Sequence, residues 1–456
     1  MIAPPTTDLQ RIKAFFIPKF HQIAHFLMKQ GIAVAGNLLY GLLCVRLLPV
    51  SDYAKFAVLY GFMGSLTVLL DMGASSTLAP LVGTQIDNLP LIAGYIASVR
   101  RIVQKVYLVA APIAGLLFAL LLAKRHWGFW VVAQMIAVLL VTAWFARVSS
   151  SYGSVLIIRR DRARYYQIQI IGSLGSLSLL LILWAVHGVN IYAAILLNLA
   201  QTIYLATAYH HRARQLLGVK AEHSPLMEKR IIRLATPNIP SVLFYAVQGQ
   251  VTLMLITLFG QNTASIANVG ALSRLSQMFL FLNQMNPILI EPFFARLPPA
   301  RLKRTFLLSV AIIAICGSGF AALALLFPEA FLWLLGPHYS QLRIEVGLMI
   351  LASVIYYIGG FIWVVNASRR FVFWWNTFGI IPFTVLVQGF FIWKLDLSTV
   401  RNVLILNIAT ASASLVMAVS CTVYGFVYGP QKMEPHPSEE TSEPSEPLEE
   451  VANLIP

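Results

Sequence analysis

The 456-residue chain has few charged residues, which make up only 11% of it, whereas 58% of its residues are hydrophobic. Its mean hydropathy is +0.75. A soluble domain of this size needs far more polar surface. Apolar runs of about 20 residues recur along the chain, and each is long enough to cross roughly 30 Å of hydrocarbon. The scarcity of charge therefore excludes a soluble globular protein and predicts an all-α polytopic membrane protein.

Cysteines and catalytic motifs are also scarce. Cys44, Cys316 and Cys421 all lie in apolar runs, which predicts small buried side chains rather than a disulfide framework. The sequence contains no CxxC, HExxH, GxGxxG or Walker pattern, and no carboxylate–histidine grouping suited to acid–base chemistry. We therefore expect no catalytic residue, metal or cofactor, and we predict that the chain is not an enzyme.

Twelve membrane-spanning helices are predicted from the apolar runs. They cover residues 24–48, 54–80, 103–123, 128–149, 166–186, 189–208, 238–259, 266–292, 305–327, 345–365, 371–393 and 401–426. The longest internal connection divides them into six plus six. The expected domains are a cytoplasmic N-terminal lead (1–23), an N-lobe (24–208), a cytoplasmic linker (209–237), a C-lobe (238–428) and a disordered acidic tail (429–456).

The basic residues are distributed unevenly about these spans. If both termini are cytoplasmic, 25 of the 33 Lys and Arg residues lie on the cytoplasmic side, 7 lie on the other side, and Arg274 lies within a span. This bias follows the positive-inside rule and predicts a multi-pass protein of the cytoplasmic (inner) membrane. Basic loops such as 147–164 are therefore interpreted as topology signals and contacts with anionic lipids, and no nucleic-acid partner is expected.

A weak internal repeat relates the two halves of the chain. A shift of 213 residues aligns Asn37 with Gln250 and Asp71 with Gln284. Only 8 of the 43 positions in 31–73 are identical, so the repeat is supported mainly by the coincident polar positions. Because each half has six spans, the repeat is parallel, with a pseudo-axis along the membrane normal.

Polar side chains within the spans mark candidate cavity residues, because a polar group in lipid is costly and normally faces the bundle interior or a water-filled cavity. In the eighth span, polar residues from Arg274 to Glu291 share about 100° of helix arc. We therefore predict a hydrated seam between the halves, with interhelical hydrogen bonding as the structural alternative. The candidate residues are Arg274, Asp71, Gln277, Gln284, Gln248, Gln250, Asn37 and Arg46, the last of which lies near a span end where snorkelling also explains it.

The segment "GNLLYGLLCVRLLPVSDYAKFAVLYGFMGSLTVLLDMGASS" resembles the first two spans of Wzx-type polysaccharide exporters, which belong to the multidrug/oligosaccharidyl-lipid/polysaccharide (MOP) superfamily. The family pattern is a small-residue span, a short Arg-Leu loop, an acidic–aromatic pair and a D-x-G. These elements are matched here by Arg46-Leu47, Asp52-Tyr53 and Asp71-Met72-Gly73.

Two later segments extend the resemblance to about residues 20–428. "ATPNIPSVLFYAVQGQ" resembles the opening of the family's seventh span, and "FLWLLGPHYSQLRIEVGLMIL" resembles its connection between spans 9 and 10. The chain departs from the family pattern at Gln248 and Gln250, because the seventh span often carries an acid there.

The resemblance implies two six-helix lobes in a V around a central cavity, working by alternating access. The implied substrate is a polyprenyl-pyrophosphate-linked oligosaccharide, flipped outward for cell-surface polysaccharide biosynthesis, with membrane lipids and glycan-assembly proteins as partners. Within this scheme we expect Arg274 to hold the anionic part of the cargo by charge-assisted hydrogen bonds. Asp71 is expected to balance charge or to gate access.

Three alternatives remain open at this point. A cation-coupled multidrug exporter of the MATE type belongs to the same superfamily and would need acidic groups in its cavity. A membrane-embedded glycan polymerase or acyltransferase would usually present a sizeable outer loop, whereas the longest one expected here is about 328–344. The third alternative is an assembly scaffold that transports nothing.

Overall fold

The computed structural model describes residues 8–83, 85, 87–123, 127–218, 224–236, 239–371 and 373–429. These residues form helices joined by short connections, and no strand occurs among them. The acidic tail predicted to be disordered lies outside the described residues, apart from its first position, Gly429.

The described residues of the first half form eight α-helices. They are α1 (Asp8–Leu47), α2 (Val50–Asp71), α3 (Leu78–Val82), α4 (Leu89–Ala123), α5 (Phe129–Ile158), α6 (Arg162–Ala185), α7 (Ile191–Leu217) and α8 (Pro225–Ala235), with a short 3-10 turn η1 (Ser75–Thr77). The second half contains α9 (Ile239–Gln248), α10 (Val251–Phe259), α11 (Thr263–Arg296), α12 (Pro299–Leu326), α13 (Pro328–Leu335), η3 (Pro337–Tyr339), α14 (Arg343–Ser368), α15 (Trp374–Lys394) and α16 (Val400–Tyr428).

Local capping signals explain where several of these helices begin. The side chains of Asn190, Asn262 and Thr399 precede α7, α11 and α16, and each accepts a hydrogen bond from a backbone N–H in the first turn. Such a bond satisfies one of the donors that a helix start leaves unpaired. Gly218, in the left-handed conformation at φ 63°, ends α7.

The predicted polytopic all-α fold is confirmed, and each of the twelve predicted spans coincides with a helix or with a pair of helices. Among the described residues, nine helices are long and apolar enough to cross a membrane, and a bent pair brings the total to ten. The other two predicted spans correspond to α11, which carries several polar residues, and to α15, whose apolar stretch covers only Phe378–Lys394.

Several predicted spans differ from the helices that form. α1 begins at Asp8 instead of residue 24, α4 at Leu89 instead of residue 103, and α7 ends at Leu217 instead of residue 208. The seventh is broken into α9 and α10, which meet at 49° around Gly249–Gln250. The second ends at Asp71 instead of residue 80, because Met72 and Gly73 adopt positive φ angles of 44° and 74° that a helix cannot continue through. The fourth continues to Ile158 instead of ending at residue 149.

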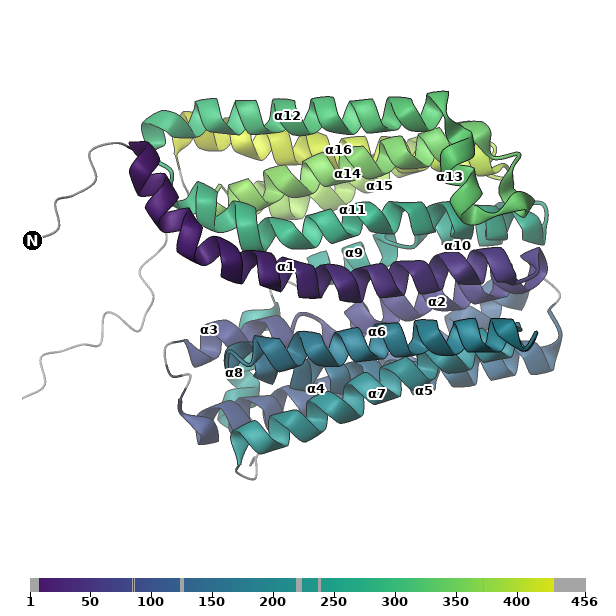
Figure 1. Ribbon diagram of the computed structural model, residues 1–456, viewed down its shortest axis with the longest axis horizontal. Helices are drawn as coiled ribbons and strands as arrows, with labels where there is room; N and C mark the ends of the chain where they lie inside the picture. The colour runs from purple at the N-terminus through teal and green to yellow at the C-terminus, as the bar shows by residue number, and fades with distance from the viewer. Residues whose placement is uncertain are drawn as a thin grey trace, which may run out of the picture.

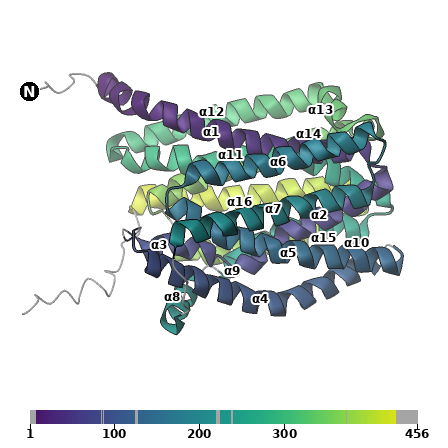
Figure 2. The same cartoon turned by 60° about the horizontal axis from the view of Figure 1, so that its bottom comes forward.

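The helices of each half pack mainly on one another. In the first half α5 packs on α7 and α1 on α6, and in the second half α14 packs on α11 and α16. Figure 1 shows α1 running along the boundary between the two groups of helices, and in the turned view of Figure 2 α4 and α8 lie at the lower edge of the bundle. Contacts between the halves are made by α1 and α2 with α11, by α2 with α9, and by α1 with α13.

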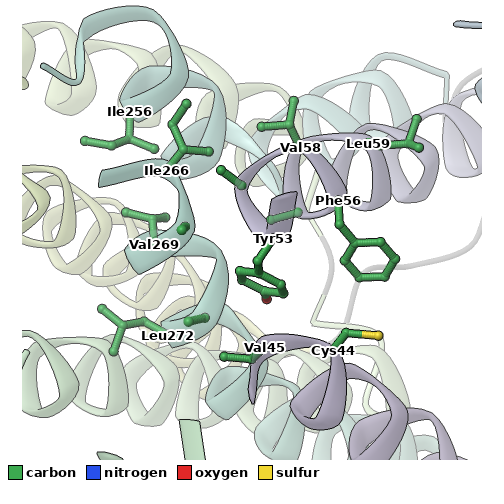
Figure 3. Packing of buried hydrophobic residues seen from close by; sticks show 14 of the residues in the cluster. Cys44, Val45, Tyr53, Phe56, Val58, Leu59, Ile256, Ile266, Val269 and Leu272 are labelled. Carbon is green, nitrogen blue, oxygen red and sulfur yellow. The ribbon is translucent and has the colours of Figure 1, made fainter. Parts of the chain in front are cut away.

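The most extensive contact between the halves lies where α2 crosses α11. Tyr53 of α2 is fully buried there between residues of α1 and residues of α11 such as Val269 and Leu272 (Figure 3). A Cβ atom on Gly270 would lie 2.6 Å from the Cβ of Ala57. Gly270 is therefore required for this crossing, which joins the two halves near the end of the bundle at the α1–α2 turn.

Candidate functional site

Arg274 lies in α11 at this crossing, and its side chain is only 3% exposed. Its Nε donates a hydrogen bond of 3.4 Å to the hydroxyl oxygen of Tyr53. Its Cζ lies 4.2 Å from the ring centre of Tyr60 and 5.7 Å from that of Phe56. All three aromatic residues belong to α2, so this guanidinium links the two halves of the chain.

Glycine at position 41 leaves room for the Arg274 side chain. A Cβ on Gly41 of α1 would lie 3.1 Å from both Cδ and Nη1 of Arg274. α1 and α2 therefore enclose the guanidinium, and no ion pair to it occurs among the described residues. Cation–π contacts of this kind contribute up to about 2 kcal/mol when desolvated. That is less than a buried charge costs when it has no counter-ion.

Arg46 lies beside this crossing, at the end of α1. Its Cζ is 5.3 Å from the centre of the Trp333 ring in α13. Gly336, whose φ angle is 100°, packs against the Arg46 side chain, and a Cβ added there would lie 3.2 Å from Arg46 Cγ. Tyr339 lies edge-on to Tyr53, with 6.4 Å between ring centres. Arg46 thus belongs to a set of contacts between the halves at the α1–α2 turn.

Asp71 is the last residue of α2, and hydroxyl groups surround its carboxylate. It accepts hydrogen bonds from the hydroxyl of Ser75, from the Ser75 backbone N–H at 3.4 Å, and from the hydroxyl of Ser150 at 3.3 Å. Tyr60, which contacts Arg274, lies eleven residues earlier, or about 16 Å along the helix axis. Asp71 and Arg274 therefore belong to separate sites, and Asp71 stabilises the turn after α2.

Gln250 lies at the break between α9 and α10. Its side-chain oxygen packs against Gly61 of α2, where a Cβ would overlap it. In the same region the hydroxyl of Ser65 donates a 2.6 Å hydrogen bond to the carbonyl of Ala246. The region where α9 meets α10 therefore contacts two successive turns of α2, at Gly61 and at Ser65.

Gln248 belongs to an uncharged polar cluster inside the second half. Gln388 Nε2 donates to Gln248 Oε1 at 2.9 Å and lies 3.3 Å from the hydroxyl oxygen of Thr410. Tyr356 donates to Asn407 at 3.5 Å. The cluster connects α9, α15 and α16 through neutral groups alone.

Asn37 lines a polar cavity of about 410 Å³ within the first half. It accepts a 2.9 Å hydrogen bond from Gln201 Nε2, and Gln201 accepts one of 3.1 Å from Ser176. The other polar residues lining this cavity are Gln30, Tyr165, Tyr166 and Gln169. Amide and phenol groups of this kind can both donate and accept hydrogen bonds.

Gln277 lines a largely apolar groove of about 570 Å³ between α1, α11, α12 and α14. The side chain of Gln284 lies outside the described residues. The structure therefore brings Arg274 and Arg46 into one region at the α1–α2 turn, and it distributes the other described candidates over separate places along the bundle.

Arg147 was missed by the sequence analysis, which assigned it to a cytoplasmic loop. It lies within α5, is 4% exposed, and places its Cζ 3.8 Å from the centre of the Trp144 ring. Position 147 directly follows an apolar run that contains no turn residue, and an aromatic residue precedes it by three positions. The uninterrupted apolar run and the aromatic residue one helical turn earlier both indicate that the helix continues past Arg147.

No protein-family model matches the chain, and a search of curated proteins finds no match. The fold is nevertheless shared with solved transporters. One is an inward-facing MATE multidrug-resistance transporter of the MOP superfamily, at TM-score 0.64 and 16% identity over 88% of this chain and 93% of that one. An outward-facing MATE transporter of the same superfamily gives TM-score 0.52 and 16% identity over 89% and 94%.

A third similar structure is a MOP superfamily transporter from Pyrococcus furiosus, described as having a binding pocket of reverse polarity that suggests a different function. It gives TM-score 0.55 and 15% identity over 89% of this chain and 92% of that one. At these identities the likeness shows the fold, which is that of a MOP-type bundle of membrane-spanning helices.

Proposed function

We propose that the chain is a membrane transporter that moves a polyprenyl-pyrophosphate-linked oligosaccharide across the cytoplasmic membrane for cell-surface polysaccharide biosynthesis. In this proposal both termini are cytoplasmic, the two halves act as lobes that alternate access, and the partners are membrane lipids and glycan-assembly proteins. The shared fold supports transport, because the similar solved structures are transporters.

The sign of the buried charge favours an anionic cargo. Among the described residues, the charged side chains that are fully buried are Arg147 and Arg274. Neither is ion-paired to a described carboxylate. Arginine binds phosphate oxygens by charge-assisted, often bidentate hydrogen bonds. An interior with two arginines and no buried acid therefore suits a pyrophosphate head group better than a cation.

Arg274 is the residue we assign to the cargo. It lies where α11 meets α1 and α2, so separation of the halves at this point would expose its guanidinium to the space between them. In the closed arrangement the Arg274 guanidinium contacts the aromatic residues of α2 instead of the cargo. The lipid tail of such a cargo can stay in the bilayer beside the helices.

Contacts at the α1–α2 turn support an inward-facing state in the proposed orientation. The contacts of Arg46, Tyr53 and Arg274 join the halves at the end that would face outward. The similarity is also greater to the inward-facing MATE structure than to the outward-facing one, with TM-scores of 0.64 and 0.52.

A cation-coupled multidrug exporter is the second candidate, and the MATE names of the similar structures favour it. Export of cationic drugs needs an acid that the substrate or coupling ion can reach. Asp71 is bonded to serine hydroxyls, and the cluster around Gln248 is uncharged. The described residues therefore give this candidate less support than the anionic cargo.

Translocation in reconstituted vesicles tests the proposal. A fluorescent polyprenyl-pyrophosphate-linked oligosaccharide is placed in the vesicles, and its transfer between leaflets is measured for the wild type, Arg274→Lys and Arg274→Gln. We expect activity in that order, because lysine keeps the charge but loses the bidentate fork. Arg164→Gln is the matched control, since Arg164 is exposed in α6, and it should behave as wild type.

The same vesicles separate the two candidates. Proton- or sodium-driven efflux of ethidium without glycolipid transfer would establish the drug exporter. Glycolipid transfer that is equally fast in the Arg274→Gln protein would show that Arg274 has a purely structural role.

A further inference from the structure

Arg147 stands in an unusual environment between α4 and α5. Its guanidinium is stacked on Trp144, with 3.8 Å from Cζ to the ring centre, and lies 6.0 Å from the ring of Tyr107 in α4. The Tyr107 hydroxyl donates a 3.0 Å hydrogen bond to the carbonyl of Leu140, which fixes that ring in place. The guanidinium therefore lies between aromatic rings from both helices, Tyr107 of α4 and Trp144 of α5.

The guanidinium has no hydrogen-bond acceptor among the described residues. Its Nε and Nη1 are buried and have no hydrogen-bond partner. A buried charge normally persists only when it is paired and hydrogen-bonded. The N–H groups of arginine radiate in the plane of the guanidinium, so stacking on Trp144 occupies one face and leaves the edge of the group for an acceptor.

Arg100 adds positive charge near Arg147, and the imidazole of His210 lies beside Arg100. Arg100 of α4 interacts electrostatically with Arg147 and with His210 of α7. Arg100 donates a 3.2 Å hydrogen bond to the hydroxyl of Tyr152, and His210 packs edge-on to the same ring at 4.5 Å. The Nδ1 atom of His210 is also buried without a partner. Arg100 and His210 thus both contact Tyr152, and neither Arg100 nor Arg147 is ion-paired to a described carboxylate.

Asp71 is the nearby carboxylate that could compete for Arg147, because it is bonded to Ser150, one turn further along α5. Helical side chains point toward the N-terminus of their helix, so Arg147 points toward Trp144 and away from Ser150. The carboxylate is already engaged by Ser75 and Ser150. Asp71 therefore does not neutralise this group.

We propose that Arg147 is the core of an anion subsite within the first half of the chain, which takes a phosphate-type oxyanion from the side of Arg100. Arg147 supplies the buried donors Nε and Nη1, and the exposed Arg100 adds a second positive charge on the side from which the anion would approach. The inference depends on the surroundings of Arg147 and is independent of which cargo the protein transports. The oxyanion is either a soluble phosphate or the head group of an anionic lipid.

Trp144 provides the readout, because an anion bound to Arg147 changes the charge next to its indole. The full-length protein is placed in phosphatidylcholine nanodiscs and titrated with sodium pyrophosphate at constant ionic strength while tryptophan fluorescence is recorded. A Trp144→Phe protein identifies the part of the signal that comes from this residue. We expect a saturable change in the wild type that is absent from the Trp144→Phe protein.

Variants of the two arginines test the assignment. Arg147→Gln should weaken pyrophosphate binding about 10- to 100-fold, the usual range for loss of a charged hydrogen-bonding group, and Arg147→Lys should weaken it less. Arg100→Gln changes an exposed residue, so the protein should fold normally and bind several-fold more weakly. The control Arg164→Gln, in α6, should bind as wild type.

A second set of nanodiscs containing phosphatidylglycerol distinguishes the two sources of the oxyanion. If the lipid head group occupies the subsite, the Trp144 signal is already shifted before titration and pyrophosphate adds nothing; a full response to pyrophosphate identifies a soluble phosphate. Equal responses in the wild type and in folded Arg147→Gln would overturn the proposal. So would the lack of any Trp144 response in both kinds of nanodisc.

Discussion

Replacing Gly270 with alanine should open the bundle at the α1–α2 turn. The new Cβ would lie 2.6 Å from the Cβ of Ala57 and 3.4 Å from Cε1 of Tyr53. Carbon atoms in contact normally lie about 3.5–4.0 Å apart. Ala57 has no rotamer that would move its Cβ aside, so α2 and α11 must separate by about 1 Å at this point.

The size of the effect follows from the cost of overpacking. Extra methyl groups in a well-packed core typically cost about 1–3 kcal/mol. The penalty applies to the closed arrangement alone, because helices that have separated have room for the methyl group. Since about 1.4 kcal/mol changes an equilibrium tenfold, the open population should rise roughly 5- to 150-fold.

The native Cys44 reports this opening. It is fully buried in α1 beside Tyr53 and Phe56 (Figure 3), so a maleimide reaches it only when the crossing opens. With Cys316→Ser and Cys421→Ala as background, the labelling rate of Cys44 should rise by the same factor in Gly270→Ala.

Gly64→Ala is the matched control. Gly64 lies in the same helix α2, and nothing lies within 4 Å of a Cβ added there, so labelling of Cys44 should stay at the parent rate. If Gly270→Ala also labels at the parent rate while remaining folded, then α2 and α11 do not part at this crossing, and the proposed outer closure is refuted.

Three further predictions concern other parts of the chain. Asp71→Ala removes the acceptor for two serine hydroxyls and should destabilise the protein by about 1.5–3 kcal/mol, as seen in denaturant unfolding; unchanged stability would mean that the carboxylate is free for another role. Cysteines at Gly188 and Gln261 should react with an impermeant thiol reagent outside intact cells, whereas one at Ala163 should not, and the reverse pattern would invert the topology. Deleting residues 434–456 should leave folding and transport unchanged, because that acidic segment has little to bury; loss of transport at normal expression would point to a partner site.

The membrane-spanning helices could be predicted from sequence because each of them is encoded locally, whereas α8 and α13 fall where a linker and an outer loop were predicted. Long apolar runs bounded by turn residues predicted twelve spans, and all twelve are helical. The break at Gly249–Gln250 was not predicted, because the run on both sides of it is equally apolar and the bend is supported by contacts with α2, far away in sequence. Arg147 was misplaced for a related reason, since a charge near the end of an apolar run was taken as the start of a loop.

The candidate site was harder to predict, because its parts come from distant segments. The position of Arg274 within a span marked it as a candidate, but its partners Tyr53 and Tyr60 lie more than 200 residues earlier in the chain. Nothing local to α11 indicates that α2 surrounds this guanidinium with aromatic rings. Helical periodicity gives the face on which a residue lies, whereas the neighbour on that face is determined by how the halves pack.

The isolation of Arg274 and Arg147 from carboxylates has an electrical consequence. A full elementary charge that crosses the membrane changes in energy by about 2.3 kcal/mol per 100 mV. In the proposed orientation an inside-negative potential draws both guanidinium groups toward the cytoplasm. A conformational change that moves one of these arginines through a tenth of the membrane field would therefore change the free energy by about 0.2 kcal/mol at a potential of about 100 mV. In this orientation we expect transport to depend weakly on the membrane potential, and the dependence should decrease when both arginines are replaced by glutamine.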